Sequence, residues 1–506
     1  MSTIRRQSIL SSGIIYLGFA LGFLNTYLFT RNGGFAPSEY GLYMTFMAVA
    51  NVINSFATLG MQSYILKFYP YYQDNLKVKE NDMLGWAFIT SLLGFILVMS
   101  AGFIFRDLVI RKFSANSPDF VKYYSWVFPL GFGLTMYSLL EAYAWQLKKS
   151  VLTSFLRELF FRIITSVLAI LFFFHLIKDF DLFIKIFVFT YILLALILLI
   201  ILVRSGEIHL TLSTSRVTKK FYKKIITLCA FIWSGSLIQN IAIVFDTIVI
   251  TAVIPNGLAW AGIFALAQNM ASLIQAPQRG IIAASIAHLS RAWKDKDYDK
   301  IRRIYQRSSI NQLIFACGIF VLIWLNFMDG VKNFHLLPAY EQAKPVFLFL
   351  GLWRIVDMGT GLNSQIIGTS TLWRFEFFTG ILLLAITLPL NYIMAKQMGV
   401  VGPAIATLVS YMVYNSIRYV FLLKKFHMQP FNFKTILTLL LAVTGYYITY
   451  LLFSQIHGFA AMILRSLFFI LFYGTGIRFL HLSPDVVPVW NTLKKKLSIP
   501  YLRTRE

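Results

Sequence analysis

Residues 435–464 read TILTLLLAVTGYYITYLLFSQIHGFAAMIL, an apolar stretch without Asp, Glu, Lys or Arg. A helix needs about 20 apolar residues to cross a bilayer, so this stretch is too long for one span. The polar residues Ser454 to Gly458 interrupt it beyond its midpoint. The pattern therefore predicts two transmembrane helices joined by a tight turn at residues 454–458.

Similar runs, such as Ile9–Thr30 and Met83–Phe105, recur along all 506 residues. The composition is 58% hydrophobic and 13% charged, whereas soluble proteins carry about 25% charged residues. We predict an all-α polytopic membrane protein with about 14 transmembrane helices. The same composition excludes a soluble multidomain enzyme, a disordered chain and a disulfide scaffold. Cys229 and Cys317 lie inside apolar runs, which is typical of core residues rather than of a disulfide or metal site.

The charges are distributed unevenly, with 46 Lys and Arg against 21 Asp and Glu. If the N-terminus is cytoplasmic, 31 of these basic residues fall in inner segments and 10 in outer loops. The positive-inside rule then predicts that both termini are cytoplasmic. The densest inner segments, Arg216–Lys224 and Arg291–Arg307, are expected to anchor this topology or to bind anionic lipid headgroups. Because the basic residues are dispersed among apolar spans, we expect no nucleic-acid partner.

A weak internal repeat is visible at an offset of 221 residues. It aligns Gly41-Leu42-Tyr43 with Gly262-Ile263-Phe264, and Asn25 with Asp246. An offset of six helices keeps the membrane orientation, so it predicts two six-helix lobes related by a pseudo-two-fold axis. The predicted organisation is an N-terminal lobe (1–205), a C-terminal lobe (206–425), a C-terminal helix pair (426–482) and a basic cytoplasmic tail (483–506).

Ionisable residues within the predicted spans are the candidate site, because charge in a bilayer is costly and usually functional. The basic members are Arg157, Arg162, Arg279 and Arg354, and the acidic members are Glu158, Asp246 and Asp357. This set has a cationic bias, and the guanidinium fork suits phosphate, so an anionic substrate follows as a hypothesis.

Structural interpretations of the same residues remain open. Glu158 and Arg162 lie at i,i+4, and Arg354 and Asp357 at i,i+3, so each pair is able to neutralise itself on one helix face. Asp246 is either a proton or cation site or a hydrogen-bonded structural acid. Two further charges are expected nearer the membrane surface: Glu141 at the interface, and Arg465 with its side chain extended towards water.

Several catalytic signatures are absent from the sequence. It contains no phosphate-binding loop, no histidines at metal-ligand spacing and no nucleophile elbow. We therefore expect no enzymatic activity, no metal and no cofactor. Energy would come from a proton or Na⁺ gradient, the membrane potential or removal of the product.

Several short motifs resemble those of polysaccharide flippases. They are Ala36–Tyr43 (APSEYGLY), Leu59-Gly60-Met61, Phe68-Tyr69-Pro70, Asp246-Thr247-Ile248, Ala261–Ala265 (AGIFA) and Gln275–Arg279 (QAPQR). The chain is similar to the oligosaccharide-lipid (O-antigen-type) flippase branch of the multidrug/oligosaccharidyl-lipid/polysaccharide exporter superfamily. This resemblance implies two lobes around a cavity that opens alternately to each side. It also implies a bacterial inner-membrane location and a glycan substrate carried on undecaprenyl diphosphate.

The resemblance implies cationic cavity residues, with Arg157, Arg162, Arg279 and Arg354 as counterparts by type. Membrane lipids are the other expected partners, and the chain is expected to act as a monomer. Two other classes remain: a cation-coupled drug or metabolite antiporter of the same superfamily, and a membrane-embedded glycan polymerase or ligase. An antiporter cavity is expected to hold carboxylates and aromatics rather than four arginines. A polymerase or ligase is expected to carry a large outer loop, which this sequence lacks.

Overall fold

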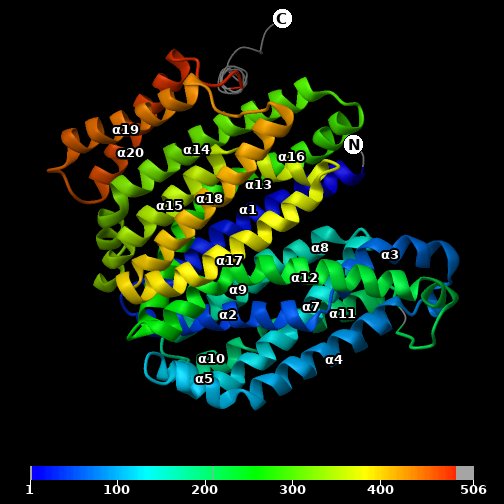
Figure 1. Cartoon of the computed structure of the whole chain (residues 1–506). Helices are drawn as coiled ribbons and strands as arrows, with labels where there is room; N and C mark the ends of the chain where they lie inside the picture. Colours follow the sequence, from blue (N-terminus) through cyan, green and yellow to red (C-terminus); the bar gives the residue numbers. More distant parts are fainter. Residues whose placement is uncertain (1–2, 209, 486–506) are drawn as a thin grey trace, which may run out of the picture. The chain divides into compact units, whose positions relative to one another are not determined.

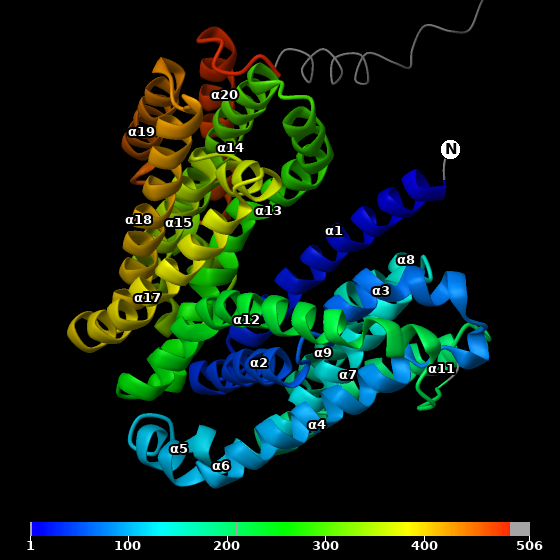
Figure 2. The same ribbon diagram turned by 45° about the vertical axis from the view of Figure 1, so that its right-hand side comes forward.

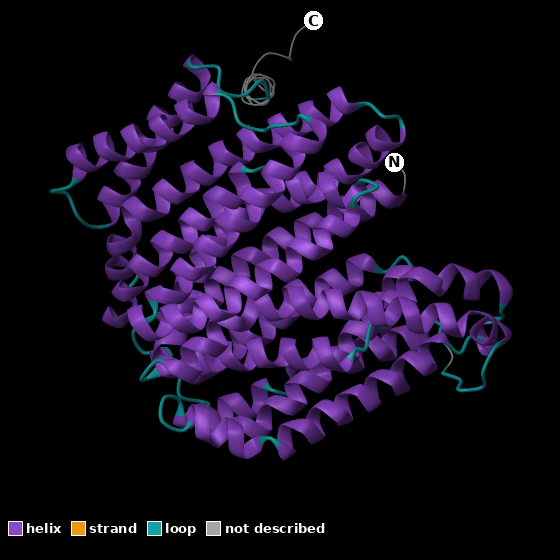
Figure 3. Ribbon diagram, in the orientation of Figure 1, coloured by secondary structure: helices purple, strands orange, loops and turns teal. Residues whose placement is uncertain are grey.

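The computed structural model describes residues 3–208 and 210–485, without the side chains of residues 3–13, 15, 16, 239, 279, 283, 284, 287 and 373. Among the described residues the regular structure consists of helices, and no strand extends beyond an isolated bridge (Figure 3). The predicted all-α class is therefore confirmed. Contacts between Cα atoms group the helices into two compact units. Unit 1 contains the residues up to Ala265 together with Asn391–Val400, and unit 2 contains Leu266–Leu390 and the residues from Val401 on.

Unit 1 is built around one helix, α7 (Val127–Gln146), whose side chains are buried on nearly all sides. Its apolar and small residues face neighbours all round, as expected for a central helix. Helices α2, α3, α4 and α11 pack directly against it. The helices of unit 1 besides α7 are α1 (Thr3–Thr30), α2 (Pro37–Ala57), α3 (Met61–Asn75), α4 (Met83–Ile104), α5 (Arg106–Phe113), α6 (Pro118–Tyr123), α8 (Ser150–Ser154), a π-helical segment (Phe155–Phe160), α9 (Phe161–Phe173), α10 (Phe180–Phe187), α11 (Thr190–Arg204) and α12 (Arg216–Val253).

The expected single span at residues 40–66 is instead two helices, α2 and α3, bent by 49°. The break contains Leu59 and Gly60, both with positive φ. A Cβ atom at Gly60 would lie 2.6 Å from the Cys229 carbonyl oxygen of α12, so only glycine permits this approach. The bend thus follows from close packing of α12 against the break, which hydropathy does not register.

Helix α12 begins at Arg216 because its first turn is held by side chains of two segments. Ser215 is its N-cap and accepts a hydrogen bond from the Thr218 amide. The buried Asp82 carboxylate accepts from the Ser215 amide (2.9 Å) and from the Thr218 hydroxyl (2.7 Å). These bonds fix where the basic segment Arg216–Lys224 starts.

Unit 2 is a bundle in which α15 packs against both α14 and α18 (Figures 1 and 2). Helices α19 and α20 pack against each other and against α14. The turn between them spans residues 454–458, so the predicted helix hairpin at this point is confirmed. The helices of unit 2, of which α13 begins and α17 ends in unit 1, are α13 (Gly257–Lys294), α14 (Tyr298–Asn333), α15 (Ala343–Gly359), α16 (Asn363–Thr369), α17 (Trp373–Met398), α18 (Val401–Phe426), α19 (Phe433–Phe453) and α20 (Phe459–Phe479).

The chain is a multi-pass membrane protein, although its count of spans depends on the criterion. Eight of the described helices are long and apolar enough to cross a membrane, or ten if each of two bent pairs is one span. The predicted number of 14 therefore stays a prediction. So do the lobe boundaries at residues 205, 425 and 482: the compact units divide instead at Ala265, because α12 packs against α2 and α3. Residues 486–506 of the predicted tail lie outside the described residues.

Candidate functional site

The first cluster of candidate residues lies in unit 1, where α1 meets the π-helical segment. Gly18 and Gly22 are spaced as in the small-xxx-small pattern that lets membrane helices approach closely. A Cβ atom on Gly18 would lie 2.8 Å from the Glu158 carbonyl oxygen, and one on Gly22 would lie 2.6 Å from Nη1 of Arg162. The two glycines therefore create the groove in which the charged residues sit.

Two ion pairs occupy this region. Glu158 and Arg162 bond at 3.1 Å, which confirms the predicted i,i+4 pairing. Arg162 also donates to the Gly18 carbonyl oxygen, so one guanidinium joins α1 to α9. Arg157 bonds to Glu141 at 2.9 Å. This partner comes from α7, and sequence spacing within one helix gave no signal for it.

The structure places Glu141 in the interior rather than at the membrane interface. Its side chain is 8% exposed, whereas that of Arg157 is 50% exposed. A half-exposed arginine within a span is expected to face water or a ligand, because contact with lipid tails would be costly. Including Glu141, the unit 1 cluster of two arginines and two glutamates has no net formal charge. Its distinctive property is therefore the exposed guanidinium and not a net positive field.

Uncharged polar residues extend the cluster along α1. The Asn25 amide donates to the Thr165 hydroxyl (2.7 Å) and to the Arg162 carbonyl oxygen (3.0 Å), and it accepts from Ser166. Sequence reasoning did not select Thr165 and Ser166, since neutral hydroxyl residues are common in membrane helices. Their bonds fix the rotation of α9 against α1 and hence the position of Arg162.

Asp246 of α12 is buried (5% exposed) and accepts a hydrogen bond from the Asn391 amide at 2.7 Å. Asn391 lies on α17, far away in sequence. The repeat offset aligns Asp246 with Asn25, which also bonds a polar residue of another helix. This similarity of polar contacts agrees with the expected internal repeat. Both predicted roles of Asp246, a coupling acid and a structural acid, fit the observed bond.

Unit 2 holds a hydrogen-bonded network that includes Asp357. Its carboxylate accepts from the Gln278 amide (3.3 Å) and from the Asn415 amide (3.2 Å). Asn415 accepts in turn from Asn363 at 3.0 Å. Arg354, one turn before Asp357, stacks on the Trp353 ring at 3.7 Å. The network joins α13, α15, α16 and α18 by polar contacts, which strengthen packing between membrane helices.

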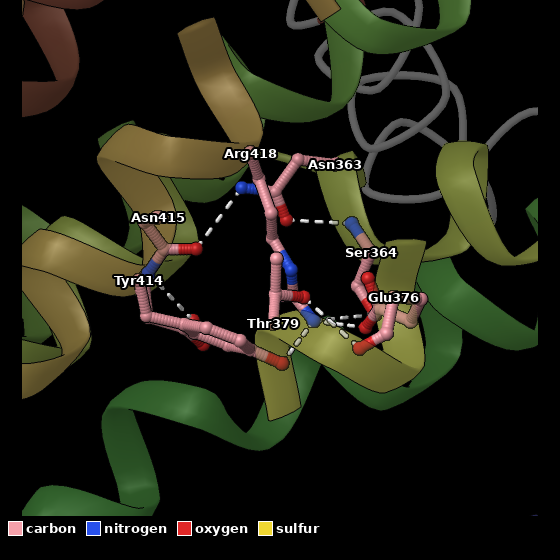
Figure 4. Close-up of polar contacts among 8 residues, drawn as sticks. Asn363, Ser364, Glu376, Thr379, Tyr414, Asn415 and Arg418 are labelled. Carbon is pink, nitrogen blue, oxygen red and sulfur yellow. Dashed lines mark hydrogen bonds and ion pairs between the residues drawn. The ribbon is translucent and has the colours of Figure 1, made fainter. Parts of the chain in front are cut away.

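The same region contains an ion pair that the predicted site omitted. Arg418 of α18 contacts Glu376 of α17, and its guanidinium also donates to the Tyr414 hydroxyl (Figure 4). Ser364 donates to Glu376 at 2.7 Å. Hydropathy ended the neighbouring spans at residues 377 and 417, which left both charges outside. Each helix continues past these points because the charges neutralise each other.

A third buried pair fastens the C-terminal helices to unit 2. Arg465 of α20 contacts Asp329 of α14 and donates to the Leu325 carbonyl oxygen at 3.0 Å. Arg465 is 8% exposed, so the expectation that it extends towards water is wrong. A buried acid was available one helix away, and pairing with it replaces hydration.

The predicted site residues fall into separate groups. Arg157, Glu158 and Arg162 are brought together in unit 1, and Asp246 has its own partner there. Arg354 and Asp357 belong to unit 2. The side chain of Arg279 lies outside the described residues. Among the described residues, no group of three or more His, Cys, Asp or Glu side chains is arranged to hold a metal ion.

The contact at Gly18 leads to a stability prediction. Gly18→Val should lower the free energy of unfolding by about 1–3 kcal/mol, because the new side chain overlaps the Glu158 backbone. Gly474→Val on α20 is the matched control, since a Cβ there meets nothing within 4 Å. Thermal unfolding in detergent measures both variants. Equal midpoints for the two variants would contradict the close packing of α1 on the π-helical segment.

No family model and no curated protein sequence matches the chain. Solved structures do. The lipid II flippase MurJ in an inward closed conformation aligns with a TM-score of 0.72 at 15% identity, over 94% of this chain and 99% of MurJ. An inward-facing multidrug resistance MATE transporter aligns with a TM-score of 0.63 at 16% identity, over 82% of this chain and 96% of that transporter. The bent form of the Vibrio cholerae MATE transporter VcmN gives a TM-score of 0.51 at 12% identity, over 83% and 97%.

These likenesses show that the chain has the fold shared by MurJ and the MATE transporters. The fold implied by the sequence resemblance to this exporter superfamily is therefore confirmed. The compared structures are of a flippase and of transporters, not of enzymes, which agrees with the expectation that the chain is not an enzyme.

Proposed function

We propose that the chain is a flippase for an oligosaccharide linked to undecaprenyl diphosphate. It would move this lipid from the cytoplasmic to the periplasmic leaflet of a bacterial inner membrane, for O-antigen or capsule-type polysaccharide assembly. The observation that carries the proposal is the alignment with a lipid II flippase over 94% of this chain, against 82% for the MATE transporter. Both termini would be cytoplasmic, and the protein would act as a monomer.

The Arg157 side chain supplies the chemistry that such a substrate needs. A guanidinium carries five N–H donors, and the bond to Glu141 engages Nη1. Half of this side chain is exposed, so donors remain for a second acceptor. A diphosphate offers several oxygens that match the planar fork. Glu141 holds the arginine in place without saturating it, and alternating access would then carry the lipid headgroup across.

A cation-coupled antiporter is the second candidate, favoured by the likeness to MATE transporters and by the buried carboxylate of Asp246. The two functions differ in their substrate. In a strain that lacks the gene, a flippase defect should leave lipid-linked intermediates on the cytoplasmic leaflet and deplete surface glycan. Restoration of both by the plasmid-borne gene supports the flippase. If glycan display is normal in the deletion strain while sensitivity to cationic drugs rises, the antiporter is correct.

Asp246→Asn tests whether this acid couples transport to an ion gradient. The substitution keeps an oxygen that accepts from Asn391 but removes the charge, so the protein should fold normally. We expect substrate binding to persist while the response to a proton or Na⁺ gradient in vesicles is lost. Asp246→Ala is the companion variant, because it removes the acceptor as well. Unchanged ion dependence in Asp246→Asn would make the acid a structural hydrogen-bond partner.

A further inference from the structure

A shallow groove lies on the surface of unit 2 where α17 begins and α18 ends. Its volume is about 380 Å³, and it is lined by Phe375 of α17 and by Ile417, Val420, Phe421, Lys424 and Lys425 of α18. Four apolar residues thus form one part of the groove, and two lysines form its end. The groove lies outside the sites described above and has no part in the proposed transport chemistry.

The apolar part of the groove has a rigid wall. The rings of Phe375 and Phe421 are stacked, with centroids 3.8 Å apart and planes inclined by 13°. Both rings pack against a buried cluster that includes Leu289, Leu362 and Leu422. The wall is therefore held by the core of unit 2, so an occupant would not have to order it first.

The two lysines are exposed, and among the described residues neither makes a hydrogen bond or an ion pair. The neighbouring acid, Glu376, is already bonded to Arg418. The end of the groove consequently carries two positive charges that no described carboxylate balances. The predicted topology places this end at the cytoplasmic surface, where the leaflet is rich in anionic lipid.

We propose that this groove binds an anionic glycerophospholipid. The phosphate would lie on Lys424 and Lys425, and an acyl chain would run along Val420 and Phe421 to Ile417. Ile417 precedes Lys424 by two helical turns, which is roughly 10 Å along the axis. This spacing places the charges at headgroup level and the apolar wall at acyl-chain level. The inference does not depend on what the protein transports.

The test is lipid binding by the purified full-length protein, measured by native mass spectrometry. Phosphatidylglycerol and phosphatidylethanolamine with identical acyl chains are titrated separately. The wild-type protein should retain phosphatidylglycerol preferentially. Lys424→Gln/Lys425→Gln should weaken phosphatidylglycerol binding roughly 5- to 30-fold, since each basic residue near an anionic headgroup contributes about a fivefold factor. Val420→Trp should also weaken it, because the indole fills the groove while the charges remain.

The control is Lys219→Gln/Lys220→Gln on α12, which removes the same charge from an exposed basic segment. It should lower phosphatidylglycerol binding less than the groove pair does. Equal losses from the two lysine pairs would mean that binding follows total charge and that the groove is not a site. Unchanged binding in Val420→Trp, or no preference between the lipids in the wild type, would also overturn the proposal.

Discussion

Arg157→Gln is expected to lower lipid-linked glycan transport by roughly 30- to 150-fold, with little change in protein level. A charge-assisted hydrogen bond contributes about 1.5–3 kcal/mol, and two such bonds to a diphosphate would be lost in part. Each 1.4 kcal/mol corresponds to a factor of ten. The measurement is restoration of surface glycan in the deletion strain, combined with the amount of lipid-linked intermediate on each leaflet. Arg157→Lys, which keeps the charge and loses the fork, should retain more transport than Arg157→Gln.

The control separates a substrate contact from a structural partner. Arg157→Gln leaves the buried Glu141 without the bond that Nη1 now donates to it. Arg157→Gln/Glu141→Gln removes that unbalanced charge as well. If Arg157 contacts substrate, the double variant remains defective. Recovery of transport in the double variant would instead show that the arginine serves only to neutralise Glu141.

Arg418→Ala is expected to destabilise unit 2 by about 3–5 kcal/mol, the typical result of breaking a buried ion pair. The Arg418 side chain is 4% exposed and contacts Glu376, Tyr414 and Ser364. Its removal leaves the Glu376 carboxylate with a lone hydroxyl donor from Ser364 among its described contacts. The unfolding midpoint in detergent should fall by several degrees.

Two controls accompany this variant. Arg418→Met/Glu376→Gln removes both charges and keeps most of the volume, so its midpoint should lie close to that of the wild type. Arg302→Ala removes an exposed pair, in which Arg302 and Asp299 are 3.8 Å apart, and should cost less than about 1 kcal/mol. Equal midpoints for Arg418→Ala and Arg302→Ala would contradict the assignment of Arg418 to the interior.

The amino-acid sequence by itself determined the class of protein, because the cost of exposing apolar side chains or backbone in the wrong solvent is local and large. The uncharged stretch at 435–464 predicted a helix pair, and the structure places its turn at residues 454–458. The Glu158–Arg162 bond was also predictable, since i,i+4 spacing on one helix is a local property. The motifs in the first loop and at Asp246 resembled those of one superfamily, and its fold is the one observed.

Only the tertiary structure decided which charges meet. Arg157 pairs with Glu141, Arg418 with Glu376 and Arg465 with Asp329, in each case across two helices. Hydropathy treats each of these residues as a penalty where it stands, so it ended the spans too early around Glu376 and Arg418 and placed Glu141 and Arg465 near the surface. The penalty of burial disappears when a partner from a distant part of the chain neutralises the charge. That compensation depends on how helices pack, and no local pattern in the sequence records it.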